Sequence, residues 1–216
     1  ALQVACCATL CELMKNIYRQ VATIMDREAQ TRTRSFEQAW RSLADSRFLP
    51  FALLTAGTAS NIIYAHAPLV AFAAMAGATL TRQRAIAVAL LVWLVNQALG
   101  FGLRGYPLTS VALIWGALMG IGTLMVVAFA SWRPEFSQSY PTGHFLWMAI
   151  AILGGFALYQ GLILLAFPLL ADGHHMGWDI VGKLFLKQFI WASAIALGHS
   201  LLLQRALLTQ TDWAKG

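Results

Sequence analysis

The chain has 216 residues, of which 59% are hydrophobic and only 11% are charged, and its mean hydropathy is +0.64. About a quarter of the residues of a typical soluble domain are charged, so this composition excludes an ordinary water-soluble globule. It also excludes a disordered chain and a disulfide scaffold, because the sequence is apolar and its three cysteines all lie near one end. We therefore predict an all-α polytopic membrane protein, a six-helix transmembrane bundle behind an amphipathic N-terminal segment.

The net charge of +6 does not indicate binding to nucleic acid. Lys and Arg are not clustered with interleaved aromatic residues, and basic loops are a normal feature of membrane proteins. Five of the nine acids and seven of the fifteen bases fall in the first 47 residues. We expect three parts: a charged cytoplasmic or interfacial segment (1–47), a transmembrane domain (48–208) and a cytoplasmic tail (209–216).

An amphipathic pattern occupies residues 10–25 of the N-terminal segment. Its apolar side chains recur every three or four residues, which places them on one face of a helix. This face can lie on the membrane, on a partner or on the protein itself. Ser35 followed by Gln38 is a capping-box pattern and predicts that a second, short helix begins there. The stripe consists of Leu10, Leu13, Met14, Ile17, Tyr18, Val21, Ile24 and Met25.

The first residues carry little chemistry. Met14 is a candidate start, and on that hypothesis residues 1–13 do not belong to the native protein. Cys6, Cys7 and Cys11 lie in this stretch and have no partner Cys or His at the spacing of a zinc site.

Six apolar runs predict six membrane spans, since a helix needs about 20 residues to cross about 30 Å of hydrocarbon. The second run is short, but fusing it with the first would give a helix of about 48 Å, too long for the bilayer. A break at residues 65–68, which ends in Pro68, favours two helices. The runs are 48–64, 67–81, 84–103, 108–132, 145–170 and 184–208.

The distribution of Lys and Arg supports an even number of spans, because cytoplasmic loops retain these residues. With six spans and the N-terminus inside, nine basic residues lie at the inner side and three at the outer side, whereas five spans remove most of this bias. We expect a multi-pass protein of the bacterial inner membrane with both termini in the cytoplasm. The inner residues are Arg32, Arg34, Arg41, Arg47, Arg82, Arg84, Arg133, Arg205 and Lys215, and the outer ones are Arg104, Lys183 and Lys187.

This topology brings polar side chains to the outer ends of the spans. An amide facing lipid costs a few kcal/mol, so these residues should face the bundle or a pocket. Hydrogen bonds between helices are an equally good explanation for each residue taken singly, and their shared depth favours a pocket. The candidate solute-binding residues are Asn61, His66, Trp93, Asn96, Gln97, Arg104, Asp172, His174, His175 and Asp179.

The outer loop at residues 172–179 combines two histidines with two aspartates, more potential ligand groups than any other predicted loop. Imidazoles ligate transition metals, and His66 can add a third nitrogen to His174 and His175. A hydrated loop with a chance pair of histidines is the favoured alternative to this metal site.

Four polar residues lie deeper in the predicted spans. His199 is the best single candidate for an axial ligand of a tetrapyrrole, although such a residue more often hydrogen-bonds a neighbouring helix. The sequence places no second histidine at matching depth in another span. The four residues are Tyr159, Gln160, Gln188 and His199.

No catalytic pattern occurs, and the predicted spans contain no Asp or Glu. We therefore expect a protein that is not an enzyme. The missing acids disfavour proton-driven transport, and the lack of a nucleotide motif means that any transport takes its energy from a partner.

Small residues are paired at helical spacing in three predicted spans: Ala52 with Ala56, Ala73 with Gly77, and Gly116 with Gly120. Such pairs let helices approach closely. With six spans, both termini inside and the Ala52-x-x-x-Ala56 pair, residues 48–208 resemble the substrate-binding S components of energy-coupling factor transporters. The resemblance implies that Ala52 and Ala56 dock on a membrane coupling subunit driven by ATPases, and that the outer loops close over a vitamin or metal ion. No substrate signature of the vitamin-binding members is present, and neither is the Met-His start of the cobalt and nickel members.

The leading hypothesis is thus a membrane subunit that binds and translocates a small solute, energised by a partner ATPase complex. The alternatives are a structural or assembly subunit of a larger membrane complex, which can hold a tetrapyrrole at His199, and a metal-dependent membrane enzyme built on the 172–179 loop.

Overall fold

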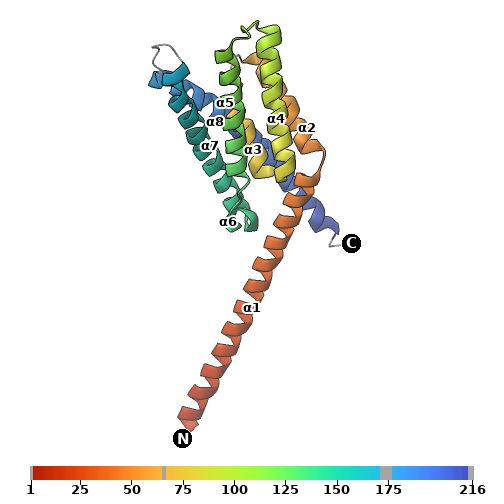
Figure 1. The fold of residues 1–216 in the computed structure, drawn as a ribbon. Coiled ribbons are helices and arrows are strands. Elements are labelled where there is room, and N and C mark those ends of the chain that lie inside the picture. Colours follow the sequence, from red (N-terminus) through yellow and green to blue (C-terminus); the bar gives the residue numbers. More distant parts are fainter. Residues whose placement is uncertain (1, 65–66, 171–176, 214–216) are drawn as a thin grey trace.

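The computed structural model describes the backbone of residues 2–64, 67–170 and 177–213. Within these ranges it describes the side chains except those of residues 2–14, 16–17, 28–29, 32, 34 and 210–213. All regular elements in this part of the chain are helices, which confirms the all-α class (Figure 1). They are α1 (Leu2–Asp45), α2 (Phe48–Ile63), α3 (Leu69–Thr79), α4 (Arg82–Ala98), η1 (Leu99–Leu103), α5 (Ser110–Ala130), α6 (Glu135–Ser139), α7 (Pro141–Leu170) and α8 (Trp178–Trp213).

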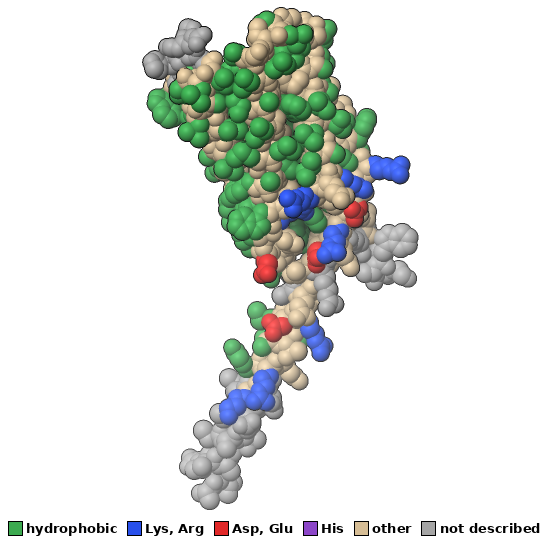
Figure 2. Space-filling model, in the orientation of Figure 1, with side chains coloured by type: hydrophobic (Ala, Val, Ile, Leu, Met, Phe, Trp, Pro, Cys, Tyr) green, Lys and Arg blue, Asp and Glu red, His purple; other side chains and the backbone are tan. Residues whose placement is uncertain are grey.

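Four helices of the described chain are long and apolar enough to cross a membrane: α4 continued by η1, α5, α7 and α8. The helices α2 and α3 are apolar but shorter, about 24 and 16 Å long at 1.5 Å per residue. Hydrophobic side chains cover the bundle in the view of Figure 2, and the charged side chains visible there lie along α1 and where α1 joins the bundle. This end is called the α1 end below, and the opposite end the far end. An apolar outer surface of this kind is that of a membrane protein.

The short helix α3 lies at the centre of the bundle. All eleven of its residues are buried, and it packs against α4, α5, α7 and α8. Close packing depends on small residues: a Cβ at Gly77 would lie 2.7 Å from the Ala130 Cβ and 3.0 Å from the Val127 carbonyl oxygen. Because α3 is surrounded by protein, its hydrophobicity reflects a core position and not contact with lipid.

Both ends of α3 are capped by side chains from other parts of the chain, Gln188 of α8 and Arg133 between α5 and α6. At its start, the Ala71 N–H donates to the Gln188 Oε1 at 2.9 Å, and at its end the Arg133 guanidinium donates to the Leu80 carbonyl at 2.9 Å. The same guanidinium lies 4.7 Å from the centre of the Trp40 ring, and its burial lowers the pKa of Arg133 from the ordinary value. A buried helix end has no water to hydrogen-bond its free backbone N–H and C=O groups. These two side chains therefore provide the missing hydrogen-bond partners.

The prediction of a second helix beginning at Ser35 is wrong. The chain forms one helix from Leu2 to Asp45, and the Ser35 hydroxyl donates to the Thr31 carbonyl at 2.9 Å inside it. The segment contains neither Gly nor Pro, so no residue breaks the helix. A serine inside a helix can donate its hydroxyl to a carbonyl of the preceding turn.

Among the described side chains of α1, those of its C-terminal part pack against the bundle. Phe36 and Ala39 are buried against Leu203 of α8, and the rest of the helix extends away from the α1 end (Figure 1). The predicted apolar stripe is exposed where its side chains are described, with Tyr18 77% and Met25 65% exposed.

Candidate functional site

The helices α2 and α4 lie side by side and run in the same direction. Arg84 at the start of α4 donates to the carbonyls of Ala44 and Ser46 just before α2, at 2.8 and 3.1 Å. Arg104, just after η1, donates to the carbonyls of Asn61 and Tyr64 at the end of α2. Arg104, a predicted solute-binding residue, therefore caps α2, and its charge satisfies carbonyls that the helix leaves open.

Asn61 and Asn96 lie one turn beyond a close contact between these two helices. A Cβ at Gly57 would lie 2.6 Å from the Val92 side chain, and each asparagine follows one of these residues by four positions. Because the helices are parallel, both amides reach the same depth near the far end. Both residues are buried, and the Asn61 Nδ2 donates to the Gly57 carbonyl at 2.9 Å.

Trp93 and Gln97 lie on another side of α4, against α5. The Trp93 Nε1 donates to the Gly116 carbonyl at 2.9 Å, its ring covers Gly120, and the Gln97 amide covers Gly116. The Gly116 and Gly120 pair therefore makes room for two side chains of α4, which is internal packing.

Three amide atoms near the far end have no hydrogen-bond partner within the described residues: Asn61 Oδ1, Asn96 Oδ1 and Gln97 Nε2. A buried polar atom without a partner costs about 1–3 kcal/mol. Two acceptors at the α2–α4 contact and one donor at the α4–α5 contact thus remain available to a ligand.

Asp179, another predicted residue of the far end, is not part of this group. Asp179 lies in the first turn of α8, where it is exposed and pairs with Lys183 at 3.8 Å. His66, Asp172, His174 and His175 lie outside the described residues. Elsewhere in the described chain, no three side chains of the metal-ligating kinds come together.

The deeper polar residues stabilise the bundle. Gln188 caps α3, as described above, and Tyr159 packs on Gly122 of α5. Gln160 is buried, and the Lys187 ammonium lies 4.9 Å from the centre of the Tyr64 ring.

A pair of histidines lies near the α1 end, which the sequence did not predict. The Nε2 atoms of His144 on α7 and His199 on α8 are 3.1 Å apart, and each residue is only 1% exposed. The statement that His199 has no partner at matching depth is wrong, because α7 begins at Pro141 and its first turn is folded against α8. An iron held between two imidazoles would separate the nitrogens by about 4 Å, so this pair fits a shared proton better than a bis-histidyl haem.

The hydrogen bond of the pair uses one nitrogen of each ring. One imidazole donates through its Nε2 and the other accepts there, which leaves the His199 Nδ1 outside the pair. This Nδ1 atom is buried and has no partner among the described residues.

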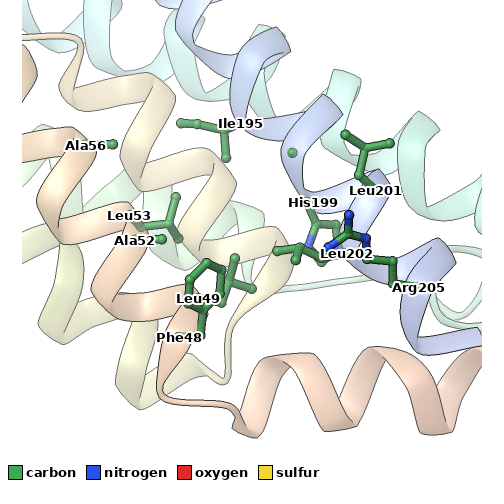
Figure 3. Close-up of a pocket in the computed structure, with 11 residues that line it drawn as sticks. Phe48, Leu49, Ala52, Leu53, Ala56, Ile195, His199, Leu201, Leu202 and Arg205 are labelled. Atoms are coloured by element: carbon green, nitrogen blue, oxygen red, sulfur yellow. The ribbon is translucent and has the colours of Figure 1, made fainter. Parts of the chain in front are cut away.

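His199 also lines a groove between α2 and α8, which we call the α2–α8 groove (Figure 3). The groove has a volume of about 430 Å³ and is apolar apart from His199 and Arg205. Ala52 and Ala56, the predicted docking pair, lie on its α2 wall. The lining residues are Phe48, Leu49, Ala52, Leu53, Ala56, Ile195, Gly198, His199, Leu201, Leu202 and Arg205.

These features define a class, a helical membrane protein built around a buried central helix, with unpaired amides at one end and an apolar groove at the other. Comparison of the chain with protein-family models, curated proteins and solved structures finds no match.

Proposed function

We propose that this protein is a membrane subunit that binds a small solute at the far end of the bundle and moves it across the membrane with energy from a partner ATPase complex. The observation that carries the proposal is the set of three unpaired amide atoms on Asn61, Asn96 and Gln97. Buried polar groups in membrane helices are expensive, and an open donor and two open acceptors suit a polar solute.

The topology that goes with this function has six membrane-embedded helices. In it, α2 and α3 form a broken pair of short helices ahead of the four long ones. The number is even whether this pair crosses the bilayer or returns within it, so both termini stay on one side. The Arg-rich α1 end is then cytoplasmic, and the far end opens to the exterior.

The coupling subunit of this proposal docks along α2. Ala52 and Ala56 are partly exposed and small, which suits close approach of another helix. A vitamin-like molecule or a metal ion is the expected solute class, with His66, His174 and His175 as further candidates for its ligands.

The test is mass spectrometry of the small molecules released when the purified protein is denatured. We expect a polar solute that is enriched with the native protein and lost from Asn96→Leu and Asn61→Leu. Thr123→Val is the matched control, because its hydroxyl is buried and already bonded to the Met119 carbonyl at 2.7 Å. Identical profiles from the native protein and all three variants would refute the proposal.

The second candidate is a structural or assembly subunit of a larger membrane complex. It is favoured by the exposed apolar stripe on the projecting part of α1, which includes Tyr18, Val21 and Met25. In the version with a tetrapyrrole, the purified protein would show a Soret band that His199→Ala removes. A colourless preparation would argue against that version.

A further inference from the structure

The size of the α2–α8 groove indicates what it can hold. Its α8 wall runs from Ile195 to Arg205, which is about 15 Å of helix. Its volume is about 430 Å³, and its lining is apolar apart from His199 and Arg205. A long apolar groove of this volume admits an alkyl chain.

His199, one of the two polar residues that line the groove, has an unpaired nitrogen. Its hydrogen bond with His144 uses the His199 Nε2, and the buried His199 Nδ1 has no partner within the described residues. A hydroxyl can both donate and accept, so an occupant that brings one to this atom would remove the cost of an unpaired buried polar atom. A plain hydrocarbon chain would not.

Arg205 supplies a positive charge at the α1 end of the groove. The side chain is exposed, and among the described residues it has no hydrogen bond or ion pair. Figure 3 shows it turned back along α8 toward His199, the direction in which helical side chains lean. A guanidinium binds phosphate through two parallel hydrogen bonds, and basic residues at the membrane surface attract anionic lipids.

We propose that the α2–α8 groove binds an anionic phospholipid from the leaflet at the α1 end. One acyl chain lies between α2 and α8, the phosphate binds Arg205, and a hydroxyl of the headgroup hydrogen-bonds the His199 Nδ1. Phosphatidylglycerol has all three features. This inference goes beyond the proposed function and does not depend on the solute site, which lies at the opposite end of the bundle. The groove shares Ala52 and Ala56 with the proposed docking face, so a coupling subunit there would cover the bound lipid.

The experiment is a lipid titration of the full-length protein in neutral detergent, followed by native mass spectrometry. The probes are phosphatidylglycerol and phosphatidylcholine with identical acyl chains. We expect phosphatidylglycerol to bind about fivefold more tightly, as one interfacial arginine would provide. Arg205→Gln should abolish this preference. Arg82→Gln, which removes another exposed arginine at the same end but away from the groove, should retain it.

A second variant tests the groove by filling it. A side chain added at Gly198 would meet no atom within 4 Å, so Gly198→Leu can occupy the groove without disturbing the helices. It should reduce the binding of both lipids at least fivefold. Gly161→Leu is the matched control, because Gly161 also has open space around it but lies on α7.

The hydroxyl is tested with phosphatidylmethanol, which has the same charge and no hydroxyl. The native protein should prefer phosphatidylglycerol to it, and His199→Phe should lose that preference.

Several results would overturn the inference. Equal affinity of the native protein for phosphatidylglycerol and phosphatidylcholine would do so, as would equal effects of Arg205→Gln and Arg82→Gln. Full displacement of phosphatidylglycerol by oleate at equal concentration would assign the groove to free fatty acids instead. A dimer in the native spectrum that Gly198→Leu abolishes would assign it to a second copy of the chain.

Discussion

The two short apolar helices, α2 and α3, follow each other in the chain but are packed in opposite ways. Every residue of α3 is buried, whereas α2 buries one face, formed by Leu49, Leu53, Gly57, Ser60 and Asn61. Phe51 and Ile62 on the other face are exposed. Hydrophobicity shows that a helix avoids water, but it does not show whether lipid or protein covers it. The helix ends are alike at one terminus, because Arg104 caps the end of α2 as Arg133 caps the end of α3.

The largest effect is expected where the core helix has no room. Gly77→Leu should destabilise the protein by about 3 kcal/mol or more, since the new side chain would meet the backbone of α5. The measurement is the midpoint of unfolding of the purified protein in detergent. The control Gly161→Leu, at a position with open space, should change it little. Equal midpoints for the two variants would show that α3 is not tightly enclosed.

The next largest effect is expected at the end of α3. Arg133→Gln removes the donor to the Leu80 carbonyl and the contact with the Trp40 ring, and should cost about 2 kcal/mol. The control Arg82→Gln removes an exposed arginine that follows α3 closely in the sequence. It should leave the unfolding midpoint unchanged within error. If both substitutions are neutral, the cap at Leu80 contributes nothing to stability.

At the start of α3, Gln188→Leu keeps the size of the side chain but leaves the Ala71 N–H without an acceptor. A cost of about 1–2 kcal/mol is expected in the same unfolding assay. A midpoint at or above that of the native protein would indicate that another group satisfies this N–H.

The exposed face of α2 should show the smallest effect. Thr55→Leu places a larger apolar side chain on a surface that already suits lipid, so its stability should stay within about 0.5 kcal/mol. Gly57→Leu, two residues away on the buried face, should be strongly destabilising because of Val92. Similar effects at both positions would mean that α2 is enclosed on all sides, as α3 is.

The sequence predicted the helical class, the break between α2 and α3 and the long helices, because these follow from hydropathy and from Pro68. It did not predict that α3 is a central core helix, since a buried helix and a membrane span have the same composition. The continuity of α1 was also missed, because a serine that bonds its own preceding turn has the same sequence pattern as a helix cap.

The candidate site was predicted in part. Asn61 and Asn96 do reach one depth, because α2 and α4 are parallel, while Trp93 and Gln97 face α5 instead. The pairing of His144 with His199 joins residues 55 positions apart and depends on how α7 and α8 cross. A local sequence pattern does not predict such a contact. His144 was also placed outside the membrane, because the predicted span began at residue 145 whereas α7 begins at Pro141.

The central claim is that the far end of the bundle, with its unpaired amides, faces the exterior. It is tested most directly in a variant whose three cysteines are replaced by serine, into which Leu108→Cys or Gln83→Cys is introduced. Both positions are exposed, the first between η1 and α5 and the second at the start of α4. A membrane-impermeant maleimide added to intact cells should label Leu108→Cys at once and Gln83→Cys only after permeabilisation. Labelling of Gln83→Cys but not Leu108→Cys in intact cells would contradict the account, because a solute from outside could not reach Asn61 and Asn96.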